Sequence, residues 1–499
     1  MRSINKSIFP LTMLAVFVGY NSCDESRLDL KPQSPTEDSY FSEEVEFERM
    51  VTGIYAKLTD FYWYNTGANN CVQPVTLLPG DDITTNGQDE FEIFSNIQPG
   101  SGRLGYYFST AYQVISRAIV VMEKNAAVED GVYVKPGLKD YHRGEALFLR
   151  AYAYYVLWNV FGTAPLVTER VNDLADTRPP SSTGTQLLDQ AITDLTEAAT
   201  LLPDSWPEDQ RGRVTNNSAY GLLGKCLVFR GTVNNSATDY QAAVTAFDKI
   251  TGVSLVPVFD DNFAADTENN EESLFEYQAT RAFADDNIWL ANDFDNAVGA
   301  LSVFWGYYSN QFNLFGKAPF VATQKLVDIF EVGDPRRELS LDPVERTFKK
   351  YVTRDELNQG GSSSTNNPRI LRYADVLLLK AEALNESGGS TAEAIGQINM
   401  VRARARGNGT VPANRSTSVT DRATIRQWIM DERMMELAGE GQRWFDLRRW
   451  ALAGWITLDN DFFSSDIPGA MGFEEKNLNF PIPNNETNAN PNITQNDGY

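Results

Sequence analysis

The most apolar stretch of the chain lies at residues 143–165, and it predicts a helix that is buried on every side. From Ala151 to Phe161 the sequence holds no charged residue, and only Asn159 and the tyrosine hydroxyls interrupt the apolar run. A helix that is apolar all round has to be covered by other elements. It is too short to span a membrane, and Gly162 followed by Pro165 is a helix stop signal. We therefore interpret this stretch as the central core helix.

Apolar residues recur at helical spacing along much of the remaining chain, which predicts an all-α fold. Two stretches, 216–251 and 372–405, each hold two such helices around a turn, at Asn234-Asn235 and at Gly388-Gly389. A helical hairpin of about 35 residues has the period of a tetratricopeptide repeat, and such hairpins bury their apolar faces only by stacking. Tetratricopeptide-like hairpins are therefore expected to form the scaffold. The predicted helices are 42–58, 107–125, 139–161, 184–202, 216–231 and 238–250, with scaffold blocks at about 107–251 and 372–450.

Three segments lack this periodicity and predict long irregular loop insertions on the scaffold. They cover about 59–105, 252–368 and 451–499, and they are rich in Gly, Asn, Asp and aromatic residues. Long loops on a rigid helical scaffold are where binding residues tend to lie. We expect residues 40–499 to form a single domain that carries these insertions.

The N-terminus has the pattern of an export signal. Residues 1–22 carry Arg2 and Lys6, followed by a short apolar segment, which is typical of a signal peptide. Cys23 follows a small residue at the end of this segment, as at a lipoprotein cleavage site, so Cys23 is the expected lipidation site. Residues 23–39 then form a polar, lipidated tether, and the membrane contact is expected through the lipid alone.

Charge and histidine content narrow the range of functions. The chain has 43 Lys+Arg and 67 Asp+Glu, a formal net charge of −24, and this field repels nucleic acid and anionic lipid. A single histidine, His142, excludes multi-histidine metal sites, and the three cysteines are too few for a disulfide framework. Calcium binding at the acidic segment 258–272 stays open, but its acids fit no EF-hand spacing, so a solvated loop is favoured. We expect no metal and no cofactor.

Several segments, in order along almost the whole mature chain, resemble the SusD/RagB family of surface lipoproteins. The resemblance is carried by RYADVLLLKAEALNE (372–386), INMVRARAR (398–406), IMDERMMELAGEGQRWFDLRRW (429–450) and the C-terminal FPIPNNETNANPNITQNDGY (480–499). The N-terminal half agrees through LRAYAYYVLWNVFGTAPLV (149–167), and the acidic residues after Cys23 resemble the tag of lipoproteins sent to the outer face of the outer membrane. The resemblance implies a non-enzymatic lipoprotein of the outer-membrane surface that captures nutrient, usually glycan. It also implies delivery to a SusC-like TonB-dependent transporter.

The residues that would bind such a glycan have to come from the insertions. Sugar rings present apolar C–H faces and a rim of hydroxyls, so a glycan site needs aromatic platforms beside carboxylates or amides. Two places in the sequence supply both, one at 62–86 and one at 289–308. The candidate ligand-binding residues are Trp63, Tyr64, Asp81, Trp289, Trp305 and Tyr308.

The charged run 431–450 is interpreted as structure and not as a catalytic site. Glu440/Arg443, Arg443/Asp446 and Asp446/Arg449 are three residues apart and can pair on a helix, which favours helix-surface and inter-helix ion pairs. A glycoside hydrolase, which needs two carboxylates about 5 to 10 Å apart, is less favoured. Two further functions stay open at this point. One is a peptide-binding partner of a TonB-dependent importer, and the second is an assembly role in which the transporter holds the ligand.

Overall fold

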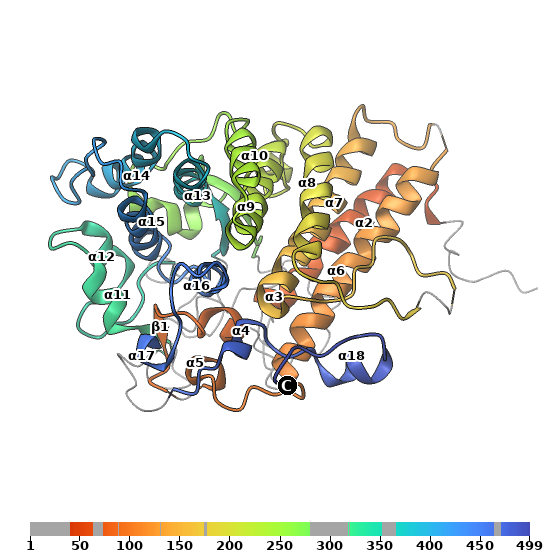
Figure 1. Ribbon diagram of the computed structural model, residues 1–499. Helices are drawn as coiled ribbons and strands as arrows, with labels where there is room; N and C mark the ends of the chain where they lie inside the picture. Colours follow the sequence, from red (N-terminus) through yellow and green to blue (C-terminus); the bar gives the residue numbers. More distant parts are fainter. Residues whose placement is uncertain are drawn as a thin grey trace, which may run out of the picture.

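The computed structural model describes residues 40–62, 73–87, 89–129, 131–173, 177–279, 318, 320–351, 366–463 and 471–499. Helices dominate these residues, as predicted, and the longest form a row in which each packs on the next (Figure 1). The row runs α6 (Gly102–Ala127), α7 (Leu138–Phe161), α8 (Gln186–Leu201), α9 (Asn216–Asn234) and α10 (Ala237–Phe247). It continues through α13 (Tyr373–Glu386) to α14 (Thr391–Arg406) and α15 (Arg422–Glu436), and α2 (Glu44–Lys57) lies against α6 and α7.

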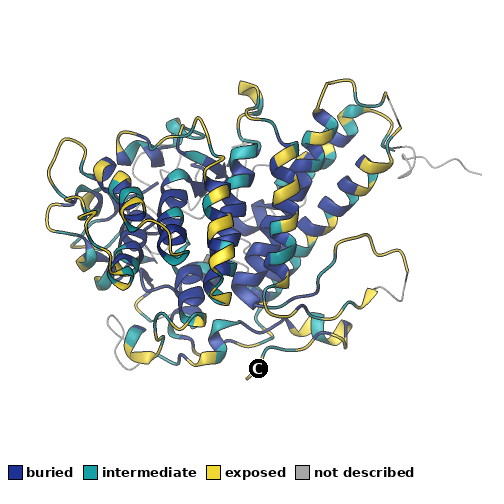
Figure 2. Ribbon diagram, turned by 45° about the horizontal axis from the view of Figure 1, so that its top comes forward, coloured by how far each residue is buried: buried dark blue, intermediate teal, exposed yellow. Residues whose placement is uncertain are grey.

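Helix α7 is the central core helix that the apolar run predicts. All of its residues from Gly144 to Phe161 are buried, and its end at Gly162 has a positive φ of 73°, which favours glycine. Figure 2 shows that buried positions follow the inner helices, whereas exposed positions follow the outer faces and the connecting loops. Among the described residues, no helix combines the length and apolarity that crossing a bilayer requires.

The two predicted hairpins are confirmed, because α9 and α10 pack together, and so do α13 and α14. Their turns contain residues with positive φ, Asn235 at 50° and Gly388 at 79°. Ser236 and Ser390 cap the second helix of each hairpin by accepting a hydrogen bond from a backbone N–H in its first turn.

The predicted insertions contain short elements that the sequence pattern did not reveal. In chain order these are α3 (Thr59–Tyr62), α4 (Gln73–Leu77), β1 (Ile83–Thr84), α5 (Glu90–Ile93), β2 (Ser273–Glu276), β3 (Val321–Ala322), α11 (Gln324–Ile329), α12 (Pro335–Ser340), β4 (Arg369–Arg372), α17 (Asn460–Phe463) and α18 (Asn484–Ala489). Strands β1 and β3 pair antiparallel with Ile83 opposite Ala322, and β2 pairs antiparallel with β4 with Phe275 opposite Leu371. Each pair joins residues that are distant in the sequence.

The charged run 431–450 is not one helix, and two of its three expected ion pairs do not form. The break separates Glu440 from α16 (Arg443–Leu452), whereas Arg443 and Asp446 both lie in α16 but pair with Asp81 and with Arg433 and Arg449, respectively. α15 ends at Glu436 and α16 begins after Gly439 and Gly441, which have positive φ of 73° and 76°. Glu440 instead pairs with Lys350 at 2.8 Å and with Arg372. Asp446 and Arg449 pair within α16, as predicted, and both are buried.

Candidate ligand-binding site

Most of the candidate ligand-binding residues lie in two segments outside the described residues. Trp63 and Tyr64 belong to residues 63–72, and Trp289, Trp305 and Tyr308 belong to residues 280–317. Cys23, the predicted lipidation site, also lies outside the described residues. Asp81 is described, and so are the residues that flank both segments. The structure therefore places the ends of the two segments.

The residues just before segment 63–72 contact the residues just before segment 280–317 through a pair of stacked tyrosines. Tyr62, the residue before 63–72, stacks on Tyr277 with ring centroids 5.2 Å apart and an angle of 22° between the planes. The hydroxyls of Tyr277 and Thr59 lie 3.1 Å apart, within hydrogen-bonding distance. Since Tyr277 comes two residues before Ala279, the last described residue before 280–317, the described residues that precede the two segments lie side by side.

Further along the chain, the residues that follow the two segments meet in the β1–β3 pair. The Thr323 hydroxyl donates a hydrogen bond to the carbonyl oxygen of Asp81 at 2.7 Å, and the Thr323 N–H donates to the carbonyl of Asp82 at 3.0 Å. These contacts place the strand that follows residues 280–317 beside the turn that follows residues 63–72. The described residues that follow the two segments are thus in contact, as are those that precede them.

A third segment, residues 352–365, begins and ends at the same place. The Asn366 side-chain amide donates to the Tyr351 carbonyl at 2.7 Å, which closes the base of this segment. The Ala279 N–H donates to Oδ1 of Asn367 at 2.7 Å, and the Tyr277 N–H donates to the Pro368 carbonyl at 3.1 Å. The flanks of three irregular segments therefore meet around Tyr277.

The carboxylate of Asp81 is buried and is already paired with two cations. Its Oδ1 lies 2.5 Å from Nε of Arg443, and its Oδ2 lies 2.6 Å from Nζ of Lys325. Burial alone would raise the pKa of Asp81, but the charges of Arg443 and Lys325 outweigh it and lower that pKa to about 2. A ligand contact of Asp81 stays a prediction. Its observed contacts fix Arg443 and the half-exposed Lys325 at the edge of the site.

Two hollows border the tyrosine pair. A cleft of about 660 Å³ lies between α2, residues 208–213 and residues 265–278, and Tyr277 is part of its wall. Its other polar lining is mostly carboxylate and amide, which can accept hydrogen bonds from hydroxyls. These groups are Glu48, Glu208, Asp209, Gln210, Asp266, Glu268, Asn269, Glu276 and Gln278. A smaller cavity of about 60 Å³ lies beneath Tyr62, inside the helical scaffold.

The histidine and the one described cysteine are built into the core. Nε2 of His142 lies 2.8 Å from Glu48 and Nδ1 lies 3.0 Å from the Tyr133 hydroxyl, so both ring nitrogens have partners. Cys226 is a free, buried thiol whose pKa burial raises to about 12. Across the described ranges, no three His, Cys, Asp or Glu side chains form a group that could hold a metal ion.

Sequence reasoning missed the residues that hold the site together, namely Tyr277, Thr323 and Arg443. Tyr277 was visible in the sequence only as one aromatic residue among many. Arg443 was assigned to partners within its own helix, whereas its partner Asp81 is 362 positions away in the sequence. Only the fold could reveal that contact.

The fold is that of a helical protein in which irregular segments are carried by a repeat-like scaffold. The chain belongs to the SusD family. The model "SusD family" matches residues 343–499, and the model "Starch-binding associating with outer membrane" matches residues 28–227. The second description confirms the expected association with the outer membrane. Proteins of this family bind ligands and do not catalyse reactions.

Individual relatives agree with this assignment over most of their length. "SusD-like protein P2" of Formosa agariphila is 25% identical, with 98% of each chain covered. "Starch-binding protein SusD" of Bacteroides thetaiotaomicron is 23% identical, with 72% of each chain covered. Among solved structures, a "Laminarin binding SusD-like protein" has a TM-score of 0.71 at 24% identity, covering 92% of this chain and 100% of that one. A SusD homolog from Bacteroides thetaiotaomicron has a TM-score of 0.75 at 21% identity, covering 93% and 99%. The structural matches confirm the all-α, tetratricopeptide-like fold.

Proposed function

We propose that this protein is a surface lipoprotein of the outer membrane that captures a neutral oligo- or polysaccharide. The captured glycan passes to a partner SusC-like TonB-dependent transporter, and Cys23 carries the lipid anchor. The glycan binds between segments 63–72 and 280–317, where Trp63, Tyr64, Trp289, Trp305 and Tyr308 supply the aromatic platforms. The observation that carries this proposal is the meeting of the flanks of both segments at Tyr62 and Tyr277.

The charge of the protein supports a neutral ligand. The chain carries a net charge of −24, and the cleft beside Tyr277 is lined by six carboxylates and two arginines. One of these arginines, Arg213, is already paired with Glu48 and Glu145 at 2.5 Å. A uronate or a sulfated glycan would meet net repulsion here, whereas hydroxyl groups would find acceptors. The names of two relatives, which bind starch and laminarin, agree with this preference.

Affinity electrophoresis of the mature chain tests the proposal. The chain is run in gels containing laminarin, starch or an anionic polysaccharide, beside Trp63→Ala and Trp305→Ala. We expect one neutral glycan to retard the protein, and each substitution to weaken the affinity about tenfold or more because a stacking platform is lost.

The matched control is Trp428→Ala, which removes a partly buried tryptophan of α15 that stacks on Arg415. This variant should keep full retardation. Retardation by an anionic glycan alone would contradict the proposal, as would neutral-glycan binding that survives both tryptophan substitutions.

A basic peptide is the second candidate ligand, because the same carboxylates of the cleft would attract it. Titration of the mature chain with a lysine-rich peptide and with the neutral polysaccharides separates the two. Saturable binding of the peptide without retardation by any glycan would favour an importer of peptides. Binding of neither would favour a lid that holds its ligand only together with the transporter.

A further inference from the structure

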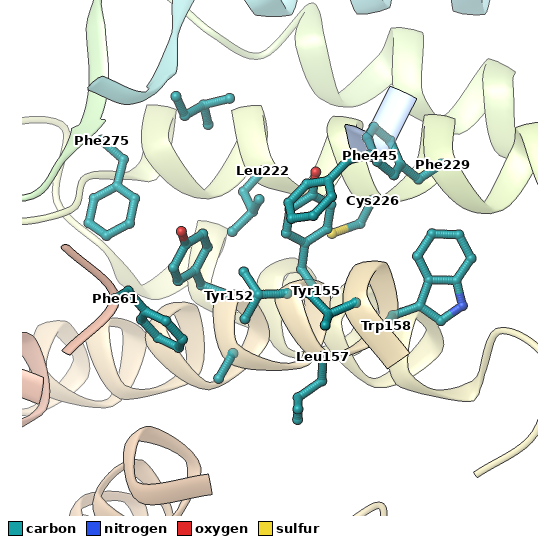
Figure 3. Packing of buried hydrophobic residues seen from close by; sticks show 14 of the residues in the cluster. Phe61, Tyr152, Tyr155, Leu157, Trp158, Leu222, Cys226, Phe229, Phe275 and Phe445 are labelled. Atoms are coloured by element: carbon teal, nitrogen blue, oxygen red, sulfur yellow. The ribbon is translucent and has the colours of Figure 1, made fainter. Parts of the chain in front are cut away.

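The cavity beneath Tyr62 has the walls of a small-molecule pocket. It is bounded by elements from distant parts of the chain, and eight of the nineteen residues in its wall are aromatic. Figure 3 shows Tyr152 and Tyr155 rising from α7 toward Phe275, Leu222 and Phe445, with Phe61 at one end. The aromatic lining consists of Phe61, Tyr62, Tyr107, Phe148, Tyr152, Tyr155, Phe275 and Phe445. Such walls suit the C–H faces of a sugar.

One polar group in this wall lacks a partner. The hydroxyl of Tyr155 is buried and makes no hydrogen bond to any described residue. Leaving a buried hydroxyl unpaired costs free energy, so a group inside the cavity that pairs with it is stabilised there. The hydroxyl is also held in its neutral form, because burial raises the pKa of Tyr155 well above its usual value.

A second polar group of the wall, the ammonium of Lys225, has one N–H group that neither of its two hydrogen bonds uses. Nζ of Lys225 donates to Oδ2 of Asp375 at 2.7 Å and to Oε1 of Gln442 at 2.7 Å, which uses two of its three N–H groups. Lys225 is paired with Asp375, which also pairs with Arg433. The other two ionic side chains of the wall are Arg369, which pairs with Glu276, and Glu440, which pairs with Lys350 and Arg372, so each charge in the wall has an opposite charge beside it. This combination suits an uncharged oxygen acceptor and gives no advantage to an anion.

The size of the cavity limits its occupant to a compact group. A volume of about 60 Å³ holds roughly four waters, or a fragment of a similar number of non-hydrogen atoms. It cannot take a whole polysaccharide segment. Tyr62 belongs both to this wall and to the flank of segment 63–72, so the cavity adjoins the proposed glycan site.

We infer that this cavity is a subsite for the hydroxymethyl arm of a neutral hexose, recognised by the Tyr155 hydroxyl. The inference rests on the proposed function, because the arm belongs to the captured glycan. Tyr155 accepts or donates the hydrogen bond to the arm's hydroxyl, Lys225 supplies a second donor, and the aromatic wall packs against its methylene.

Two sugars that differ only in this arm test the inference. Methyl β-glucopyranoside carries the hydroxymethyl group and methyl β-xylopyranoside lacks it. Saturation-transfer NMR on the mature chain should show binding of the glucoside, with its strongest transfer at the arm. The xyloside should bind at least about fivefold more weakly, since it loses one neutral hydrogen bond and the packing of the arm.

Three variants locate the effect in the cavity. Tyr155→Phe should weaken glucoside binding about fivefold and leave xyloside binding unchanged, because only the hydroxyl is removed. Leu222→Phe should abolish the preference for the glucoside by filling the cavity. Tyr240→Phe is the control, since Tyr240 is a buried tyrosine of α10 whose hydroxyl bonds Thr232 and does not line the cavity. It should behave as the native chain.

Equal binding of the two sugars by the native chain would overturn the inference. So would a preference that survives Leu222→Phe in a folded protein, or crystals soaked in the glucoside that hold only ordered water in the cavity. If Leu222→Phe does not fold, the Tyr155→Phe variant and the comparison of the two sugars test the inference without it. Retardation by laminarin or starch that is lost in Trp63→Ala would leave the proposed function standing even where this subsite fails.

Discussion

The neighbouring carboxylates of Asp81 and Asp82 have opposite pKa shifts because their partners differ. Asp81 is paired with Arg443 and Lys325, which lower its pKa to about 2 against the effect of burial. Asp82 is equally buried, but its Oδ1 has no partner among the described residues, and burial together with the charge of Asp81 raises its pKa to about 7. Both residues precede β1, so this pair lies at the base of the proposed glycan site.

Asp82 is expected to make stability depend on pH. Its pKa in the folded protein, about 7, lies above the ordinary value of 3.8, so the folded state binds the proton more tightly. The resulting stabilisation is fully present below about pH 4 and is lost as the pH rises through 7. In Asp82→Asn this dependence should be absent, so the variant should be more stable than the native chain at pH 8 by roughly 2–4 kcal/mol.

Urea unfolding of both proteins at pH 5 and pH 8 measures this difference in the free energy of unfolding. The gap between Asp82→Asn and the native chain should widen from pH 5 to pH 8. A gap that is the same at both pH values would show that Asp82 ionises normally in the folded protein.

At the scale of elements, the break between α15 and α16 determines which charges meet. If residues 431–450 were one helix, Glu440 and Arg443 would face each other. Instead the chain turns at Gly439 and Gly441. Glu440 therefore forms ion pairs with Lys350 and Arg372, and Arg443 forms an ion pair with Asp81. The turn thereby connects the repeat-like scaffold to the loop that carries β1.

Gly439→Ala should destabilise the protein for two reasons that can be separated. Its φ of 73° strains any residue with a Cβ, and an added Cβ would lie 2.8 Å from Cε1 of Phe348. Gly454→Ala is the matched control, with a φ of 71° and open space around the added Cβ. We expect Gly439→Ala to lower the free energy of unfolding by about 1–3 kcal/mol more than Gly454→Ala. Equal losses in chemical denaturation would contradict the close contact with Phe348.

The periodicity of apolar residues predicted the helices well, whereas contacts between residues distant in the sequence could not be predicted. Helical periodicity at 216–231 and 139–161 corresponds to α9 at Asn216–Asn234 and α7 at Leu138–Phe161, because each pattern reflects buried positions of one helix. Strands β1 and β3 have two residues each and pair across more than two hundred positions, so they leave no periodicity. The site depends on such pairings. The sequence could therefore indicate the residue types of the site but not the contacts that assemble it.

At the scale of the whole molecule, a buried network of charges joins the residues before β2 to the helices of the C-terminal half of the chain. Arg372 of β4 pairs with Glu272, Glu436 and Glu440, and Arg404 of α14 pairs with Glu272 and Glu436. These carboxylates are buried, and removing one cation would leave fewer positive charges to compensate them. Since Glu272 precedes β2 and the Tyr277 region, the network fixes the flank of segment 280–317 on the scaffold.

The described flanks of the irregular segments form a common base for the proposed binding surface. The flanks of segments 63–72, 280–317 and 352–365 are set by stacked rings, a short strand pair and buried amides. A ligand that contacts the first two segments therefore needs little ordering of the scaffold beneath them.

The most direct test of the proposed glycan site is a crystal structure of the mature chain with a short oligosaccharide of the polysaccharide that retards it. We predict that the sugar contacts residues of both 63–72 and 280–317, near the stacked pair of Tyr62 and Tyr277. A sugar bound elsewhere, such as on the hairpin of α13 and α14, with both segments free of contact, would contradict this prediction.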